Sequence, residues 1–266
     1  MKKTTKHALR TLVQLLCIVV MLAAAVWIVF LLRQEDESRS YADNLAQEVV
    51  RTVSVEPSAQ PPTAPSPTEE APLFDELCPI SVDFDALDGT DIVAWLYCEE
   101  PSVSYAVVQG KDNDEYLHAL PDGQYSYAGT PFMDYRNAPD LTDLNTIIYG
   151  HNMKDDTMFS AFVNYKEQTY YDAHPQMYLV TPTHAYRIEL LAGCVTDASS
   201  ALYELPGSVK EKEKLLADAR ENSTFRADIT EEANDRLVTL STCSYEFSDA
   251  RFVLIGRLVE IGLQPS

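Results

Sequence analysis

The chain opens with one long apolar stretch and continues, after a proline-rich segment, with short β-branched runs. Residues 11–32 carry no charged side chain and consist mainly of Leu, Val, Ile and Ala. A bilayer core is spanned by about 20 apolar residues in a helix, so the 22 residues of this stretch are long enough. The pattern predicts an N-terminal transmembrane helix over residues 11–32.

Charges on either side of this stretch predict its orientation. Basic side chains precede it and an acidic run follows it: Lys2, Lys3, Lys6 and Arg10, then Glu35, Asp36 and Glu37. The positive-inside bias places residues 1–10 in the cytoplasm and the rest of the chain outside the cell membrane, as a single-pass protein. A cleaved signal peptide is the alternative, but the small residues at 23–25 lie in mid-stretch, which favours an uncleaved anchor.

Residues 33–75 read as a connection between this anchor and a folded domain. Over residues 40–55 apolar side chains recur at helical spacing, which predicts a short juxtamembrane helix. Residues 56–72 are rich in proline and favour extended polyproline geometry. We therefore expect the extracellular domain to occupy residues 76–266.

Within that domain the pattern is mostly β with peripheral helices. β-branched and aromatic runs predict strands at 92–98, 105–109, 145–150, 176–181, 185–196, 236–242 and 250–261. Two segments look helical. Residues 155–165 carry an apolar face, and Ser208 followed by Glu211 is a capping box that opens a helix to about Asn222.

Composition excludes some functions. The net charge of −21 argues against nucleic-acid binding, which needs Lys and Arg to neutralise phosphates. The acidity serves solubility or gives a mild attraction for basic substrate segments. The chain has five cysteines without a C-x-x-C pair or zinc-type spacing, and no Gly-rich phosphate loop, so we expect neither metal nor cofactor. Cys98 and Cys194 read as buried strand thiols, and a Cys78–Cys98 disulfide is the alternative for that pair.

Three polar side chains at strand ends could together perform nucleophilic acyl transfer. Cys243 ends the run Thr239-Leu240-Ser241-Thr242-Cys243, Arg251 begins the next run, and His151 follows the run 147–150. A thiolate can attack a carbonyl, an imidazole can move protons, and a guanidinium can meet the developing oxyanion.

Each candidate has competitors. The other histidines are His7, His118, His174 and His184. Only His151 closes a β-branched run beside a glycine, Gly150, which lets another chain approach closely. Arg257 shares a strand face with Arg251, so alternation alone does not choose between them. Proximity to Cys243 across a short hairpin favours Arg251.

These motifs resemble those of the sortases, the cysteine transpeptidases of Gram-positive cell surfaces, and of class B in particular. The resemblance covers roughly residues 80–262. It rests on Thr-Leu-Ser-Thr-Cys at 239–243, Tyr-Gly-His-Asn-Met at 149–153, Val-Val-Gln-Gly-Lys-Asp-Asn at 107–113, Phe-Met-Asp-Tyr-Arg-Asn at 132–137, and Arg251 on the strand after the cysteine. The predicted helix between 208 and 222 matches the class B subtype.

The resemblance implies a closed, mostly antiparallel β-barrel and a catalytic set of His151, Cys243 and Arg251. It implies that Cys243 attacks the Thr carbonyl of a C-terminal sorting motif, of the Asn-Pro-x-Thr-Asn or a related Pro-x-Thr-Gly type. A peptidoglycan cross-bridge amine or its lipid-linked precursor then resolves the thioacyl enzyme. The side chains implied to bind the sorting peptide are Asn113, Leu117, Tyr149, Tyr203, Ser241 and Thr242.

Three other functions compete with wall anchoring. A cell-wall cysteine endopeptidase would resolve the thioester with water, but many such hydrolases place Cys before His in the chain, the reverse of the order here. A pilin-polymerising sortase would use a different acceptor. A non-catalytic wall-binding module on a stalk would need no thiol.

Overall fold

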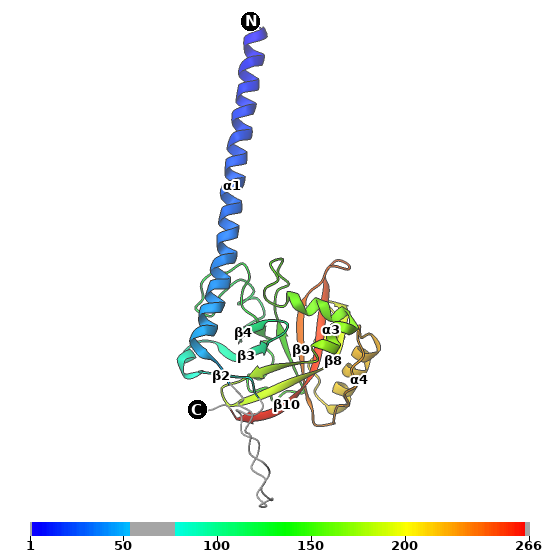
Figure 1. Cartoon of the computed structure of the whole chain (residues 1–266). Coiled ribbons are helices and arrows are strands. Elements are labelled where there is room, and N and C mark those ends of the chain that lie inside the picture. The colour runs from blue at the N-terminus through cyan, green and yellow to red at the C-terminus, as the bar shows by residue number, and fades with distance from the viewer. Residues whose placement is uncertain (1, 54–77, 264–266) are drawn as a thin grey trace, which may run out of the picture.

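The computed structural model describes residues 2–53 and 78–263, without the side chains of residues 2–13, 31, 32, 34, 35 and 263. The proline-rich segment predicted over residues 56–72 lies outside the described residues. Figure 1 shows one long helix that stands away from a compact β-rich body.

The long helix is α1 (Lys2–Val49), which joins the predicted anchor and the predicted juxtamembrane helix into one element. Across the side chains that the structure describes, no helix contains a stretch both long enough and apolar enough to cross a membrane. The anchor predicted over residues 11–32 includes residues 11–13, 31 and 32, whose side chains lie outside the described set.

The body is a closed β-barrel, as predicted. Within the described part of the chain its strands follow the order β10-β8-β7-β3-β4-β5-β6-β9. Their bounds are β3 (Ile92–Cys98), β4 (Val103–Val108), β5 (Phe132–Met133), β6 (Asn145–Tyr149), β7 (Gln176–Val180), β8 (His184–Asp197), β9 (Arg236–Cys243) and β10 (Ala250–Leu263). All seven predicted strands are present, and β5 is an additional strand of two residues.

Two strand pairs of the barrel are parallel, and one of them builds the site. β6 pairs with β9 in parallel, with Tyr149 opposite Ser241. β4 and β5 are the other parallel pair, and the remaining neighbours are antiparallel. The β6–β9 pairing brings the C-terminal ends of both strands to the same edge of the barrel.

Successive side chains of β9 and β10 point alternately into the barrel interior and to its outer face. Val238, Leu240 and Phe252 belong to the interior core. Leu237 and Val253 have the opposite parity and pack under helix α4 (Val209–Glu221) on the outside. Because side chains in a strand alternate, Ser241 and Cys243 share the outer face with Leu237.

The C-terminal end of α1 packs on the body. Val49 is buried in a second core with Ile80 and Trp95. Two short strands, β1 (Val50–Thr52) and β2 (Ile80–Val82), continue this contact as an antiparallel pair. The end of the segment predicted to connect anchor and domain therefore packs on the body, with Val49 in the same core as Trp95 of β3 and residues 50–52 paired with β2.

The remaining helices are short. They are η1 (Asp85–Leu87), η2 (Ser160–Lys166), α3 (Gln168–Ala173) and η3 (Ala201–Tyr203), in addition to α4. At the start of α4, the Ser208 hydroxyl accepts a hydrogen bond from the Glu211 N–H, as the capping box predicts.

The helix predicted over residues 155–165 is only partly present, and its first five residues are not helical. Asp156 and Met158 adopt φ values of 62° and 56°, which a right-handed helix cannot contain. The 3₁₀-helix η2 starts only at Ser160, after these two residues.

Candidate active site

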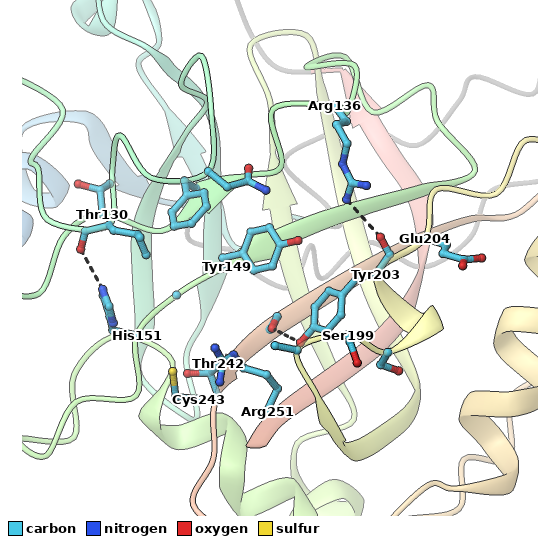
Figure 2. A pocket seen from close by; sticks show the side chains of 17 residues that line it. Thr130, Arg136, Tyr149, His151, Ser199, Tyr203, Glu204, Thr242, Cys243 and Arg251 are labelled. Atoms are coloured by element: carbon cyan, nitrogen blue, oxygen red, sulfur yellow. Dashed lines mark hydrogen bonds between the residues drawn. The ribbon is translucent and has the colours of Figure 1, made fainter. Parts of the chain in front are cut away.

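Cys243 and Arg251 occupy directly opposed positions on neighbouring strands. Cys243 ends β9, Arg251 lies near the start of β10, and the antiparallel register pairs them. Opposed residues of an antiparallel pair project to the same face, with Cβ atoms about 5 Å apart. The thiol and the guanidinium therefore share the outer face of the barrel, and Figure 2 shows them next to each other.

His151 is held beside them by the loop that follows β6. The Gly150 N–H donates to the Ser241 carbonyl, which continues the β6–β9 pairing. The Phe159 ring packs so closely on Gly150 that a Cβ at this position would lie 2.6 Å from it. The Phe159 N–H also donates to the His151 carbonyl, at 2.9 Å. A glycine at 150 is therefore required for the loop to present His151 as it does.

The hydrogen bonds of His151 indicate which ring nitrogen is available. Its Nε2 lies 2.9 Å from the Leu117 carbonyl oxygen, and because a carbonyl only accepts, Nε2 carries the proton. Nδ1 is thus the nitrogen that can exchange a proton with a reacting group. Burial, with a contribution from His118, lowers the pKa of His151, although the hydrogen bond to Leu117 opposes this shift.

A second imidazole lies against His151. The rings of His118 and His151 are stacked, with centroids 5.5 Å apart and an interplanar angle of 15°. The His118 Nδ1 lies 3.1 Å from the Tyr127 carbonyl oxygen. The sequence offered His118 only as a competitor of His151, and its spacing gave no sign of this contact.

A pocket of about 490 Å³ opens in front of Cys243, His151 and Arg251 (Figure 2). All nine site residues predicted from the sequence line it: Asn113, Leu117, Tyr149, His151, Tyr203, Ser241, Thr242, Cys243 and Arg251. They come from four separate parts of the chain, and the barrel brings them together. The pocket is also lined by Thr130, Phe132, Arg136, Gly150, Ala198, Ser199, Ser200 and Glu204.

Two tyrosines form one wall of the pocket. The rings of Tyr149 and Tyr203 are stacked, with centroids 6.0 Å apart. The Tyr203 hydroxyl lies 2.8 Å from the Ser241 hydroxyl. Ser241 is in turn two residues before Cys243 on the same face of β9.

Two polar groups near the pocket were missed by reasoning from the sequence. Asn152 donates from Nδ2 to the Cys243 carbonyl oxygen at 2.9 Å, which ties the His151 loop to the end of β9. Arg136 lines the pocket and forms an ion pair with the buried Asp134. The segment 132–137 is one of the motifs that carry the family resemblance, but nothing in its spacing indicates which of its side chains faces the pocket.

The structure decides between Arg251 and Arg257. Arg257 forms ion pairs with Glu189 and Asp235, at 2.7 Å and 3.1 Å, away from the pocket. Arg251 lines the pocket, and its Nη1 donates to the carbonyl oxygen of the neighbouring Ala250. Arg251 is therefore the guanidinium that can meet a bound substrate.

The other cysteines of the body have no access to the pocket. Cys78, Cys98 and Cys194 are buried free thiols, so the alternative Cys78–Cys98 disulfide is not formed. Burial raises the pKa of Cys98 to about 11 and that of Cys194 to about 12. Such thiols behave as small hydrophobic side chains. Cys243 is partly exposed.

Comparison with known proteins identifies the family. No family model matches the chain. Sortase B of Listeria monocytogenes is 34% identical over 174 residues, which cover 64% of this chain and 70% of that protein. Sortase B of Staphylococcus aureus is 27% identical over 183 residues, which cover 67% of this chain and 75% of that protein.

Solved structures agree with these relatives. The structure of sortase B from B. anthracis in complex with AAEK1 has a TM-score of 0.68 and 28% identity, and the match covers 86% of this chain and all of that one. The Staphylococcus aureus sortase B–substrate complex has a TM-score of 0.63 and 27% identity, with 67% of this chain and 85% of that one covered. The likeness to the Listeria protein, together with these structures, shows that the chain belongs to the class B sortases, the cysteine transpeptidases that anchor surface proteins.

Proposed function

We propose that Cys243, His151 and Arg251 carry out the transpeptidation. His151 Nδ1 accepts the thiol proton of Cys243, and the sulfur attacks the carbonyl carbon of Thr in a C-terminal sorting motif. As the bond from this carbon to the next residue's nitrogen breaks, the same nitrogen of His151 gives that proton to the departing amine. An acceptor amine then attacks the thioester and gives a proton to His151, which returns it to the Cys243 sulfur as the carbon–sulfur bond breaks. The single observation that carries this assignment is the convergence of the three side chains on one pocket.

Arg251 is suited to stabilise the oxyanion that forms during both attacks. It stands opposite Cys243 in the strand register, so its guanidinium lies within reach of a carbonyl held at the thiol. Donors aimed at a developing oxyanion are worth about 10²–10³-fold in rate. Its planar fork can also donate to a second carbonyl oxygen of the peptide backbone.

The sorting peptide binds in the remainder of the pocket, against Asn113, Leu117, Tyr149, Tyr203, Ser241 and Thr242. The pocket contains apolar and aromatic surface together with a few polar groups, the mixture usual in ligand sites. The substrate complex of the Staphylococcus aureus enzyme supports a peptide substrate of this kind. We propose a motif of the Asn-Pro-x-Thr-Asn or a related Pro-x-Thr-Gly type.

The acceptor is an amine of the peptidoglycan cross-bridge or of its lipid-linked precursor. A solved sortase B complex with triglycine supports a short peptide amine as the nucleophile. The net charge of −21 also suits an acceptor that carries a free, positively charged amino group.

We also propose that residues 11–32 anchor the enzyme in the cell membrane, with residues 1–10 in the cytoplasm and residues 76–266 as the extracellular catalytic domain. The charge-free stretch and the basic residues before it support this arrangement. Large apolar side chains of α1 such as Val26 and Trp27 are exposed, at 70% and 62%, which also favours a lipid environment over water. Residues 33–75 connect the anchor to the catalytic domain.

The test is a product analysis with a panel of sorting peptides, with and without a glycine-based or diamino-acid acceptor amine. We expect cleavage after Thr, an acyl-enzyme mass on Cys243, and a shift from free acid to amide when amine is added. Cys243→Ala should be inactive but folded. If acid remained the sole product with every amine, the endopeptidase function would replace the proposed one.

A further inference from the structure

One buried carboxylate beneath the pocket holds several pocket-lining side chains at once. Asp134 follows β5 and its side chain has no exposed surface. Its Oδ1 accepts hydrogen bonds from the backbone N–H and Nε of Arg136, at 3.0 Å and 2.8 Å. Its Oδ2 accepts from Arg136 Nη2, Asn113 Nδ2 and the Tyr149 hydroxyl, at 2.8 Å, 3.1 Å and 2.9 Å.

The electrostatics of this cluster fit an ionised Asp134. Burial opposes its ionisation, but the hydrogen bonds from Arg136, Asn113 and Tyr149 outweigh this effect and lower its pKa to about 2. Burial, reinforced by Asp134, raises the pKa of Tyr149, so the phenol keeps its proton and donates it. Charge-assisted hydrogen bonds of this type are about twice as strong as neutral ones.

Arg136 extends the cluster across the pocket. The same Nη2 that contacts Asp134 also donates to the Tyr203 carbonyl oxygen at 3.2 Å, as drawn in Figure 2. Tyr203 is therefore held at both ends, by Arg136 at its backbone and by Ser241 at its hydroxyl. Its ring stacks on Tyr149, which Asp134 holds directly.

We propose that Asp134 is a positioning residue that sets the shape of the peptide pocket. It does not line the pocket itself, but through Asn113, Tyr149 and Arg136 it fixes both stacked tyrosines and one polar side chain beside them. This inference rests on the proposed binding of a sorting peptide in the pocket. Side chains held in place before binding lose less conformational entropy when the ligand arrives. A residue that holds them in place therefore raises the affinity for the peptide.

Asp134 should have little influence on the reacting groups. Cys243 is positioned by its pairing with β10, and the His151 loop by Ser241, Phe159 and Asn152. None of these contacts involves Asp134. Loss of the carboxylate should therefore weaken peptide binding while the thiol keeps its own reactivity.

The experiment compares Asp134→Asn with the wild type on the best substrate of an Asn-Pro-x-Thr-Asn peptide panel. Asn keeps the volume but removes the charge and turns an amide N–H₂ toward the guanidinium. We expect KM to rise on the order of 10-fold, the change that follows loss of one strong hydrogen bond. We expect kcat and the rate of Cys243 alkylation by iodoacetamide to stay within a few-fold.

Asp143→Asn is the matched control. Asp143 accepts hydrogen bonds from Asn137 Nδ2 and from the Ala138 N–H, at 2.8 Å and 2.7 Å, and does not line the pocket. This variant loses a comparable carboxylate from the same loop, so it should lower thermal stability with KM unchanged. An Asp134→Asn protein that behaved in the same way, less stable but with normal KM, would overturn the proposal.

Arg136→Lys keeps the test decisive if Asp134→Asn fails to fold. The Arg136 side chain is 42% exposed, so the change is tolerated by packing, yet Lys cannot contact Asp134 and the Tyr203 carbonyl as the fork does. A raised KM supports the proposal and an unchanged KM contradicts it. The wild type distinguishes failure of the proposed function from failure of this inference. If the wild type cleaves no sorting peptide, the proposed function fails. If it cleaves the peptide and the variants keep its KM, only the role of Asp134 is removed.

Discussion

Cys243 and Arg251 face each other across the antiparallel pair of β9 and β10, with seven residues, 244–250, between them. This register means that the nucleophile and the guanidinium need no long-range contact to meet. The strand pairing that builds the barrel also places them. Any change that preserves the pairing should therefore preserve their relative position.

Arg251→Lys tests whether the guanidinium acts in the reaction. Lys keeps the positive charge but loses the planar fork and its parallel donors. We expect kcat/KM to fall on the order of 10²–10³-fold, with the melting temperature nearly unchanged, in a peptide-cleavage assay.

Arg257→Lys serves as the control for this change. Arg257 lies on the same strand but forms ion pairs with Glu189 and Asp235 on the far part of the barrel. It should lose stability and keep activity. A larger loss of kcat/KM in Arg257→Lys than in Arg251→Lys would contradict the assignment.

Thiol accessibility provides a second prediction. Cys78, Cys98 and Cys194 are buried, and burial raises the pKa of each of them. The thiolate is the reactive form, so these three should resist alkylation at neutral pH. In a protein lacking residues 1–32, which removes Cys17, intact-mass analysis after brief iodoacetamide treatment should show one adduct. Cys243→Ala should show none, and two rapid adducts in the parent protein would disprove the buried environment of the others.

The strands could be predicted because they are marked locally, whereas their closure into a barrel was implied only by the family resemblance. The runs that became β9 and β10 are β-branched and bounded by polar residues, and their short connection implies a hairpin. The pairing of β6 with β9 carries no such local mark, because the strands are far apart in the chain. Only the family resemblance placed His151 beside Cys243.

The supporting residues could not be predicted for a related reason. Asp134 and Arg136 are two residues apart, and their side chains meet because β5 ends after two residues and the chain turns. The contact of Arg136 with Tyr203 joins positions 67 residues apart. Helical and strand periodicity describe which face a residue occupies, but not which distant loop will pack over that face.

The start of the folded unit is open to a direct test. The sequence places the start of the extracellular domain at residue 76, but the structure buries Val49 against Ile80 and pairs β1 with β2. Burial of one Val side chain is worth about 1.5–3 kcal/mol. We expect a protein starting at Asp36 to unfold at a clearly higher denaturant concentration than one starting at Asp75.

Point variants distinguish the effect of packing by Val49 on stability from the effect of the added chain length. In the longer protein, Val49→Ala should reproduce part of the loss, whereas Glu48→Ala, at an exposed position, should have almost no effect. Equal stability of the two lengths would show that the end of α1 adds nothing to the barrel.

Acid should destabilise the protein through Asp134. The folded-state pKa of this group, about 2, lies below its ordinary value near 4, so its ionised form stabilises the fold. That contribution is complete above about pH 4 and is lost as the pH falls toward 2. The shift corresponds to about 2 kcal/mol. The difference in unfolding free energy between the wild type and Asp134→Asn, measured in urea, should shrink by that amount from pH 5 to pH 2, and a constant difference would refute the shift.

The last prediction concerns Lys166, which supports the turn between Cys243 and Arg251 from outside the pocket. Its Nζ donates to the Ser244 hydroxyl at 2.9 Å and pairs with Glu246, and it lies 5.5 Å from the centre of the buried Phe252 ring. Ser244 Oγ also donates to Glu246 at 2.6 Å. This cluster ties the turn to η2.

Lys166→Met should loosen the turn without removing the fold, because the ion pair is partly exposed, with 29% and 38% of the two side chains accessible, and such pairs contribute little to stability. The thiol and the guanidinium flank the turn, and small displacements of reacting groups reduce rates strongly. We expect kcat/KM to fall on the order of 10-fold, with faster hydrogen exchange confined to residues 244–250. Lys111→Met, which removes an exposed pair with Glu115, is the control and should change neither quantity. If Lys166→Met left both the rate and the exchange of the turn unchanged, the pairing of β9 with β10 would be sufficient to hold Cys243 and Arg251 in place.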